Sequence, residues 1–321
     1  MTSKTEGLIA APLTAFHPDG TVNLEIIPSY VAFLQSNGIT GVFVNGTTGE
    51  GFSLSIEDRM AIAEQWVKAA SSPFIVIVHV SHTCQGSAAE MARHAARIGA
   101  RGVGEMGPIV YRPNSVEGLA DHAAQTAAEV PELDYYYYHI PSISGICFPM
   151  TDFLSAATSR IPNLAGIKYS HDDLVDYALC REFEAGRYDM LYGRDELLLC
   201  ALVLGCRGAV GSTYNIMAPL YARLRHALDA GRLDEAGQWQ GLSMKVVRLL
   251  AETKSFNAAL KAVMKKLGLD LGGVHSPSMN IEGATVIRLL DGLKALGFFD
   301  VASRQLSSDD TASDDPKGGC K

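Results

Sequence analysis

The sequence predicts an α/β fold of the (β/α)8 TIM-barrel type, followed by a C-terminal helical extension. Eight short apolar runs alternate with longer segments of helical periodicity, which is the rhythm of a parallel sheet. The 321 residues are enough for a barrel of roughly 250 residues with extra helices. No GxGxxG or GxxxxGK[ST] motif follows the first run, which disfavours nucleotide binding. An open sheet stays the alternative, because strand counts from sequence are error-prone.

The eight runs begin roughly 20 to 35 residues apart. In order they are GLIAAPL, GVFVNG, FIVIVHV, RGVGEMG, LDYYYYHI, LAGIKYS, DMLYG and RGAVGS. Between them, SIEDRMAIAEQWVKAA opens on a capping Ser55 with acidic residues behind it, and SAAEMARHAARIGA stops at Gly99. NIMAPLYARLRHALDAG has the same helical pattern, and the chain after the eighth run is helical in pattern to about residue 300.

Three parts are therefore expected. Residues 1–215 hold the strands and helices of the barrel, and residues 216–300 hold its last helix and the helical extension. Residues 301–321 are expected to be a disordered acidic tail, because SSDDTASDDPKGGCK is poor in apolar residues and rich in Ser, Asp and Gly.

Composition excludes several classes of protein. The net charge is −8 and no dense Lys/Arg run occurs, which disfavours nucleic-acid binding. The six cysteines form no CxxC pair, so reduced thiols are expected. The opening MTSKTEGLIAAPLTAF has an apolar run too short for a membrane span and interrupted by Pro12. Neither a signal peptide nor a membrane anchor is expected, and the expected location is the cytoplasm.

Lys168, in the run LAGIKYS, is the first candidate for chemistry. Barrels of this type place their active sites at the C-terminal ends of the strands. An ammonium in an apolar strand is costly unless it is paired or loses its proton. Desolvation lowers the pKa of a lysine, and its neutral amine attacks carbonyls. The alternative is a structural lysine that snorkels or pairs with Asp172 or Asp173.

Tyr138 ends the run DYYYYH. Because side chains alternate along a strand, Tyr136 and Tyr138 share one face while Tyr135 and Tyr137 share the other. An inward-facing Tyr138 at the strand end would present a phenol that relays a proton. The alternative is that all four tyrosines are strand formers that only pack.

The loop NGTTGEG, residues 45–51, follows the second run. Its glycines permit a tight backbone, and Thr47 and Thr48 offer hydroxyls and amides that suit an anion, most simply a carboxylate. An ordinary βα turn is the alternative, since glycine and threonine are common in turns.

Two later loops carry polar side chains. In GRDE, Asp195 and Glu196 are able to accept hydrogen bonds from substrate hydroxyls or to cap the next helix. In GSTYN, Ser212 is either a ligand or a turn residue. His79 and His82 have HxxH spacing, but no acid or thiolate cluster accompanies them, so no metal site is expected.

Together these motifs resemble the pyruvate-dependent class I aldolases of the N-acetylneuraminate lyase and dihydrodipicolinate synthase superfamily. The resemblance covers residues 7 to about 300 and rests on GTTGE, YHIP and GIKYS. The stretches VNGTTGEGFSLS, YYYYHIPSISG and GAVGSTYN are most similar to the N-acetylneuraminate lyases, particularly the animal-type ones.

The resemblance implies a role for each candidate. Lys168 would be the Schiff-base lysine, Tyr138 the acid/base, and Thr47 with Thr48 the holders of the pyruvyl carboxylate. Contacts to the polyhydroxylated remainder of sialic acid would come from Ser170, Gly193, Asp195, Glu196 and Ser212. Members of the family are usually homotetramers that need no metal or organic cofactor.

Two positions separate this chain from the synthases. Ile143 stands where they carry an arginine that grips a second carboxylate, and a branched apolar side chain makes no bidentate grip. Val110 stands where they use a tyrosine from a neighbouring subunit, although Tyr111 is adjacent.

Four residues depart from the lyase pattern: Ser81, Glu105, Met106 and Arg194. Each is expected to narrow the pocket or change its charge, which leaves the sugar specificity open. The expected reaction is reversible cleavage of N-acetylneuraminate to pyruvate and N-acetylmannosamine. One alternative is another pyruvate-dependent aldolase, acting on a keto-deoxy sugar acid or a 4-hydroxy-2-oxo acid. The other is a non-catalytic sensor that binds a keto acid or sugar.

Overall fold

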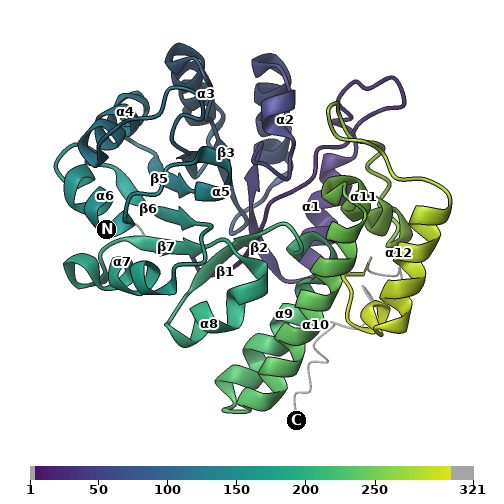
Figure 1. Cartoon of the computed structure of the whole chain (residues 1–321). Coiled ribbons are helices and arrows are strands. Elements are labelled where there is room, and N and C mark those ends of the chain that lie inside the picture. Colours follow the sequence, from purple (N-terminus) through teal and green to yellow (C-terminus); the bar gives the residue numbers. More distant parts are fainter. Residues whose placement is uncertain (1–3, 305–321) are drawn as a thin grey trace, which may run out of the picture.

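The computed structural model describes residues 4–304, and within them eight parallel strands close into a barrel (Figure 1). The first and last strands pair directly, from Gly7 beside Gly208 to Ala10 beside Gly211. The predicted barrel is confirmed, and the open sheet was the wrong alternative. The strands are β1 (Gly7–Ala10), β2 (Ile39–Val44), β3 (Ile75–His79), β4 (Gly102–Glu105), β5 (Asp134–His139), β6 (Leu164–Tyr169), β7 (Asp189–Tyr192) and β8 (Gly208–Gly211).

The strands are buried on both faces, which explains why they occur as nearly continuous apolar runs. Tyr135 and Tyr137 belong to the large core between strands and helices, whereas Tyr136 and Tyr138 lie in the barrel interior, as the alternation predicts. The interior cluster consists of Ile9, Ala11, Phe43, Ile77, Met106, Tyr136, Tyr138, Ile140, Leu191 and Val210.

The helices form an outer ring around the strands (Figure 1). Ser55 caps α2, since its hydroxyl accepts a hydrogen bond from the Asp58 amide at 3.0 Å, and Gly99 ends α3 with a φ of 83°. Both predicted helix boundaries are confirmed. The ring comprises α1 (Ile27–Ser36), α2 (Ile56–Ala69), α3 (Gln85–Ile98), α4 (Val116–Ala128), α6 (Met150–Ala157), α7 (Leu174–Gly186), α8 (Leu198–Val203) and α9 (Tyr214–Asp229). The short helix α5 (Pro141–Ser144) follows β5 directly and lies inside the ring (Figure 1).

The C-terminal extension consists of α10 (Leu233–Glu252), α11 (Phe256–Lys266) and α12 (Ala284–Ala295), all on one side of the barrel (Figure 1). Residues 301–303 pack against the barrel, because the Ser303 amide donates to the Ile216 carbonyl at 2.8 Å and Val301 and Ala302 are buried. The expected tail boundary at 301 therefore falls within packed chain. Residues 305–321, the rest of the expected tail, lie outside the described residues.

Two further sequence expectations concern membrane-spanning helices and the state of the cysteines. Across residues 4–304, no helix has the length and apolar character required to cross a membrane. The cysteines in the same part of the chain are Cys84, Cys147, Cys180, Cys200 and Cys206, and all of them are free thiols.

Candidate active site

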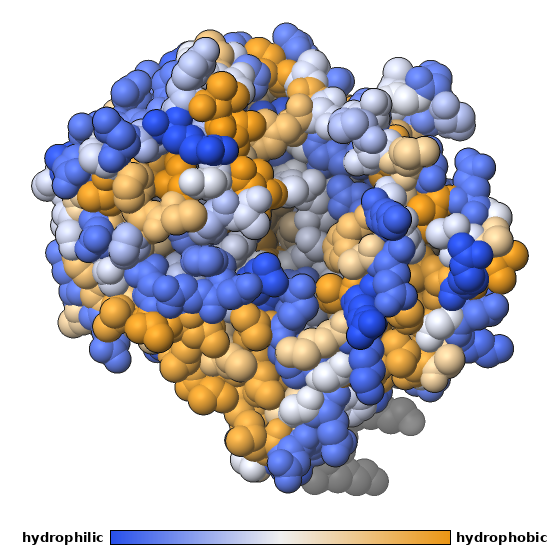
Figure 2. All heavy atoms as spheres, in the orientation of Figure 1, coloured by the Kyte–Doolittle hydropathy of each residue, from blue (hydrophilic) through white to orange (hydrophobic). Residues whose placement is uncertain are grey.

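A cavity of about 210 Å³ lies at the carboxyl ends of the barrel strands, where the molecular surface is hollowed (Figure 2). It collects predicted residues from four different strands and their following loops, as barrels of this type do. Thr47 and Thr48 adjoin it through hydrogen bonds to Tyr138 and Ser212. Its lining residues are Ala11, Tyr138, Lys168, Ser170, Gly193, Arg194, Asp195, Glu196, Val210, Ser212, Thr213, Val247 and Phe256.

Lys168 lies at the base of this cavity and is 4% exposed. Its Nζ lies 3.9 Å from the centre of the Phe43 ring and 3.8 Å from the centre of the Tyr138 ring. Burial lowers the pKa of the amine to about 7, while the charge of Asp195 raises it. A substantial fraction of the amine is therefore neutral and nucleophilic near neutral pH.

The carboxylates that sequence reasoning offered as structural partners of Lys168 are engaged elsewhere. Asp172 Oδ1 lies 3.2 Å from Arg194 Nε. Asp173 caps α7 by accepting from the amides of Val175 and Asp176, both at 3.0 Å. The structural ion pair is thus not formed, and the lysine side chain does not snorkel out of the barrel.

Tyr138 stands directly beside Lys168, because the two residues are register partners in the β5–β6 pair. Its side chain is 4% exposed. Desolvation raises the pKa of the phenol, while hydrogen bonds with Thr47 and Ser170 lower it. The phenol is therefore protonated at neutral pH and is linked to loops on both sides of the cavity.

Gly104 makes room for the aromatic wall behind the lysine. A Cβ at this position would lie 2.5 Å from the Phe43 ring, so a side chain there would displace the ring that contacts Lys168. Gly104, the middle glycine of RGVGEMG, is thus required for packing of the site.

The loop of residues 45–51 is held in a strained, closed shape. Asn45 and Glu50 adopt the left-handed region, with φ values of 61° and 56°. A Cβ on Gly51 would lie 2.0 Å from the Asn45 carbonyl oxygen, so only glycine fits there. This geometry is more constrained than an ordinary βα turn, and it places the Thr48 hydroxyl 2.6 Å from that of Ser212.

Asp195 is buried and anchored. Its Oδ2 accepts hydrogen bonds from the Thr213 amide at 2.9 Å and the Thr213 hydroxyl at 2.6 Å. Burial raises the pKa of Asp195 to about 6, against the lowering effect of those hydrogen bonds. Asp195 thus joins the β7 and β8 loops while lining the cavity, and it does not cap the helix that follows it.

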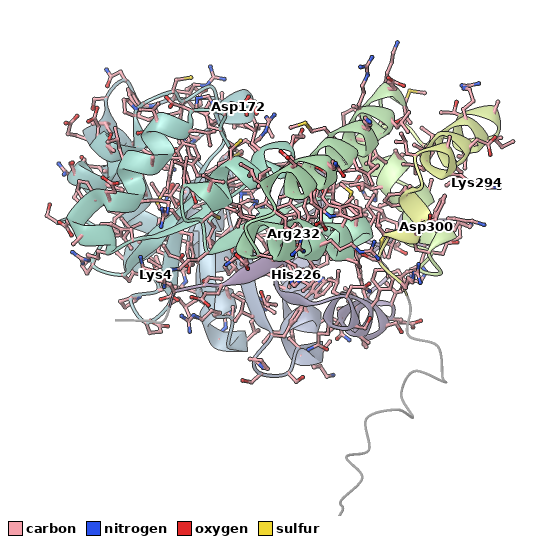
Figure 3. The ribbon with its side chains drawn as sticks, turned by 90° about the horizontal axis from the view of Figure 1, so that it is seen from below. Lys4, Asp172, His226, Arg232, Lys294 and Asp300 are labelled. Carbon is pink, nitrogen blue, oxygen red and sulfur yellow. The ribbon has the colours of Figure 1, made fainter. Side chains whose placement is uncertain are left out.

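Arg194 lies at the mouth of the cavity between two carboxylates. Its Nε is 3.2 Å from Asp172 Oδ1 and 3.8 Å from Glu196 Oε2. Figure 3 shows Asp172 at the edge formed by the carboxyl ends of the strands, with Lys4 at the opposite edge. Arg194 adds a cation to the mouth, as expected, but two acidic neighbours surround it.

The expectation that Glu105 changes the pocket is wrong. Glu105 is buried on the outer face of β4, where it accepts from the Tyr135 hydroxyl at 2.7 Å and the Thr126 hydroxyl at 2.9 Å. His122 Nε2 lies 3.9 Å from the same carboxylate. Met106, by contrast, does face the barrel interior.

Sequence reasoning considered His79 only as a metal ligand and missed its position beside Tyr138, with ring centres 5.8 Å apart. Its Nδ1 donates to the Asn45 carbonyl at 3.0 Å, since a carbonyl only accepts. The Ser81 hydroxyl then donates to Nε2 at 2.8 Å and accepts from the Met106 amide at 2.7 Å. Ser81 therefore ties β3 to β4 and fixes the histidine tautomer.

Arg59 and the extension are further contributors that sequence reasoning missed. Arg59, 1% exposed, donates to the carbonyls of His79 and Ser81 at 2.8 and 2.9 Å. Val247 and Phe256 bring α10 and α11 to the cavity wall. The one sequence signal for Arg59 was its place, as a charged residue, on the otherwise apolar face of α2. In residues 4–304, no group of three metal-ligating side chains occurs.

The dihydrodipicolinate synthetase family model matches residues 4–295, and the chain belongs to this family. The predicted recognition is thereby confirmed. Among individual relatives, the N-acetylneuraminate lyase of Gallus gallus is 37% identical over 286 residues, covering 88% of this chain and 92% of that protein. The N-acetylneuraminate lyase of Rattus norvegicus is 34% identical over 299 residues, covering 92% and 93%.

Solved structures give the same grouping. The N-acetylneuraminate lyase of Proteus mirabilis superposes with a TM-score of 0.89 at 35% identity, covering 92% of this chain and all of that one. The N-acetylneuraminate lyase (sialic acid aldolase) of Aliivibrio salmonicida also gives a TM-score of 0.89 at 35% identity, covering 92% and 98%.

Proposed function

We propose that this protein is a Schiff-base aldolase that reversibly cleaves N-acetylneuraminate to pyruvate and N-acetylmannosamine. The observation that carries the proposal is the buried Lys168 amine, which contacts two aromatic rings at the base of a polar-rimmed cavity. The names of the similar proteins from Gallus gallus and Proteus mirabilis supply the substrate.

In this mechanism neutral Lys168 attacks the C2 ketone of the open-chain sugar, and loss of water gives an iminium. The iminium accepts the electron pair of the C3–C4 bond as that bond breaks. The phenol of Tyr138 gives its proton to the hydroxyl that departs as water when the iminium forms. The resulting phenolate then takes the proton of the C4 hydroxyl, so that C4 departs as the aldehyde. The remaining enamine is protonated and hydrolysed, which releases pyruvate and restores the amine. Because the iminium is itself the electron sink, we propose no metal or organic cofactor.

The surrounding residues orient the substrate. Thr47 and Thr48 hold the pyruvyl carboxylate, which places the reacting carbons above Lys168 and limits the entropy cost of reaching the transition state. The hydroxyls of the sugar are received by Ser170, Gly193, Asp195, Glu196 and Ser212.

Two other functions are set against this one. Arg194 at the mouth is the observation that favours an aldolase for an anionic aldehyde, but Asp172 and Glu196 flank its charge. A non-catalytic sensor would have no use for a buried amine beside an inward-facing phenol. Comparing cleavage of several 2-keto acids separates the aldolases from each other.

We also propose that the protein is a cytoplasmic homotetramer. Several apolar side chains are exposed on α7 and α8, and Figure 2 shows apolar surface over α8. Contiguous apolar patches of this kind mark protein interfaces. The exposed residues are Val175 and Leu179 on α7, Val203 at the end of α8, and Leu204 directly after it.

The decisive experiment traps the imine. The protein is incubated with N-acetylneuraminate and borohydride, then its mass is measured and the modified peptide is mapped, with a parallel pyruvate sample. A reduced pyruvyl adduct on Lys168 from the sugar supports imine formation and carbon–carbon cleavage together. Lys168→Arg should give no adduct and no turnover, while Lys265→Arg, on the exposed face of α11, should match the wild type.

Other outcomes redirect the proposal. An adduct from pyruvate alone would keep the aldolase chemistry but change the aldehyde partner. No adduct from either compound, with thermal stabilisation by the ligand intact, would support the sensor.

A further inference from the structure

A buried ion pair joins the barrel to the C-terminal extension outside the cavity. Lys261 Nζ lies 3.0 Å from Glu50 Oε1, and the two side chains are 2% and 4% exposed. Glu50 Oε2 accepts a hydrogen bond from the His275 amide at 2.8 Å. Lys261 Nζ also donates to the Gly273 carbonyl and lies 4.3 Å from the centre of the Phe16 ring. Both charges are thus well satisfied, so removing either one would leave the other buried and unpaired.

Glu50 belongs to the loop of residues 45–51, the proposed carboxylate site. It is a non-glycine residue in the left-handed region, a conformation that persists only when the surrounding structure enforces it. Its amide donates to the Thr47 carbonyl at 3.1 Å, and the next amide, of Gly51, donates to the Gly46 carbonyl at 3.2 Å. The position of the Glu50 side chain therefore bears directly on the shape of the loop.

Helix α11 holds the same loop at a second point. One turn before Lys261, the Asn257 side-chain amide donates to the Thr48 carbonyl at 3.3 Å. The Thr48 hydroxyl in turn contacts that of Ser212 at 2.6 Å, and Phe256 from the same helix lines the cavity. The extension thus reaches the loop through a charge and through a neutral hydrogen bond.

We propose that Lys261 is a positioning residue for the carboxylate-binding loop, which it holds through Glu50. The inference rests on the proposed function and deepens it, because the helical extension would then help to position the loop that binds the pyruvyl carboxylate. Lys261 touches no substrate atom. Its loss should therefore weaken binding of the keto acid while leaving the Lys168 and Tyr138 chemistry largely in place.

The test compares Lys261→Met with the matched control Lys265→Met. Both replace a lysine of α11 by an uncharged side chain of similar length, but Lys265 pairs with Asp270 at the surface. For Lys261→Met, the half-saturating N-acetylneuraminate concentration should rise about tenfold or more, with kcat within about threefold of wild type. The Lys265→Met values should equal those of wild type.

A second measurement needs no substrate. Amide hydrogen exchange of residues 45–51 should accelerate in Lys261→Met and stay unchanged in Lys265→Met. Asn257→Ala is a milder variant that removes only the neutral hydrogen bond, so it tests the loop even where Lys261→Met fails to fold. The double variant Glu50→Gln, Lys261→Met should bind no worse than Lys261→Met, since the two changes remove one interaction.

Unchanged exchange in the loop of folded Lys261→Met would overturn the inference. A fall of kcat in Lys261→Met with an unchanged half-saturating N-acetylneuraminate concentration would also overturn the inference, because the lysine would then act on the chemical step. A wild-type protein that forms no adduct with pyruvate would instead overturn the proposed function, while the exchange comparison still decides whether Lys261 holds the loop.

Discussion

At the scale of single residues, the pKa of Lys168 is set by the groups that surround its amine. Two aromatic rings contact Nζ, and Asp195 acts on it as a charge within the same cavity. Burial outweighs that charge, so the pKa falls to about 7 from an ordinary value of 10.5. Chemistry that needs a neutral amine therefore becomes available near neutral pH.

The first prediction follows from this pKa. Only the neutral amine attacks a ketone, so the rate of adduct formation at low pyruvate should fall about tenfold per pH unit below pH 7 and level off above it. Cyanoborohydride trapping across about pH 5.5 to 8.5 measures the rate. A rate that still rises about tenfold per pH unit at the upper end of that range would show that the pKa of the amine is not lowered.

The second prediction concerns the Tyr138 hydroxyl. Tyr138→Phe keeps the ring that contacts Lys168 and removes only the proton carrier. Pyruvate adduct formation should survive, while cleavage of N-acetylneuraminate should fall by about 10²- to 10⁴-fold. Tyr136→Phe is the matched control, because Tyr136 lies on the same strand face but bonds to Thr5 and Asp189 away from the cavity. Equal cleavage by wild type and Tyr138→Phe would remove this tyrosine from the mechanism.

At the scale of elements, β4 shows how strand register determines what a residue does. Glu105 pairs in register with Tyr137 and Gly104 with Tyr136. Since Tyr137 faces the helices and Tyr136 the interior, Glu105 is directed outward and Gly104 inward. The carboxylate therefore belongs to the packing between β4 and α4 and not to the pocket.

The third prediction is the pH dependence of stability that Glu105 confers. Burial raises its pKa from an ordinary 4.5 to about 7, against hydrogen bonds from Tyr135 and Thr126 that lower it. Between those values the folded state binds more protons than the unfolded state, so the free energy of unfolding falls as pH rises. The loss between about pH 5 and about pH 8 should be on the order of 2 kcal/mol.

Urea unfolding at both pH values measures this loss. Glu105→Gln should make the measured loss smaller by that amount, because Asp195, Lys168 and the other groups that titrate in this range are unchanged. Glu117→Gln, an exposed substitution in the first turn of α4, should give the same loss as wild type. An identical pH dependence in wild type and Glu105→Gln would contradict the assignment.

At the scale of the whole molecule, the barrel and its extension form one functional unit. Val247 and Phe256 complete the cavity wall, and Lys261 reaches the loop of residues 45–51 across a large sequence separation. Apolar residues on α7 and α8 remain exposed on the isolated chain.

The fourth prediction is that these exposed residues lie in a subunit interface. Sedimentation of the wild type should give about four times the 34.4 kDa chain mass. Leu179→Lys with Val203→Lys should yield smaller species, because a buried unpaired charge opposes association. Ile287→Lys, an exposed apolar position on α12, serves as the control. Unchanged mass in the double variant would move the interface elsewhere.

Much of this organisation is local in origin and was predictable. The alternation of apolar runs with helical segments, the Ser55 cap and the Gly99 stop are local signals, and each has its predicted place in the structure. Tyr136 and Tyr138 lie on the same face of β5 because side chains alternate between the two faces along a strand, which the sequence alone predicts.

What the sequence determined by itself was the barrel, the start of α2 after Ser55, the end of α3 at Gly99, and the set of polar residues at the strand ends. Only the tertiary structure decided which face of each strand points inward, and hence that Glu105 faces the helices while Met106 faces the barrel interior. It also decided that Arg59 and Lys261 support the loops around the cavity. The physical reason is that periodicity is a property of neighbours in sequence, whereas register and long-range ion pairs depend on how distant segments pack.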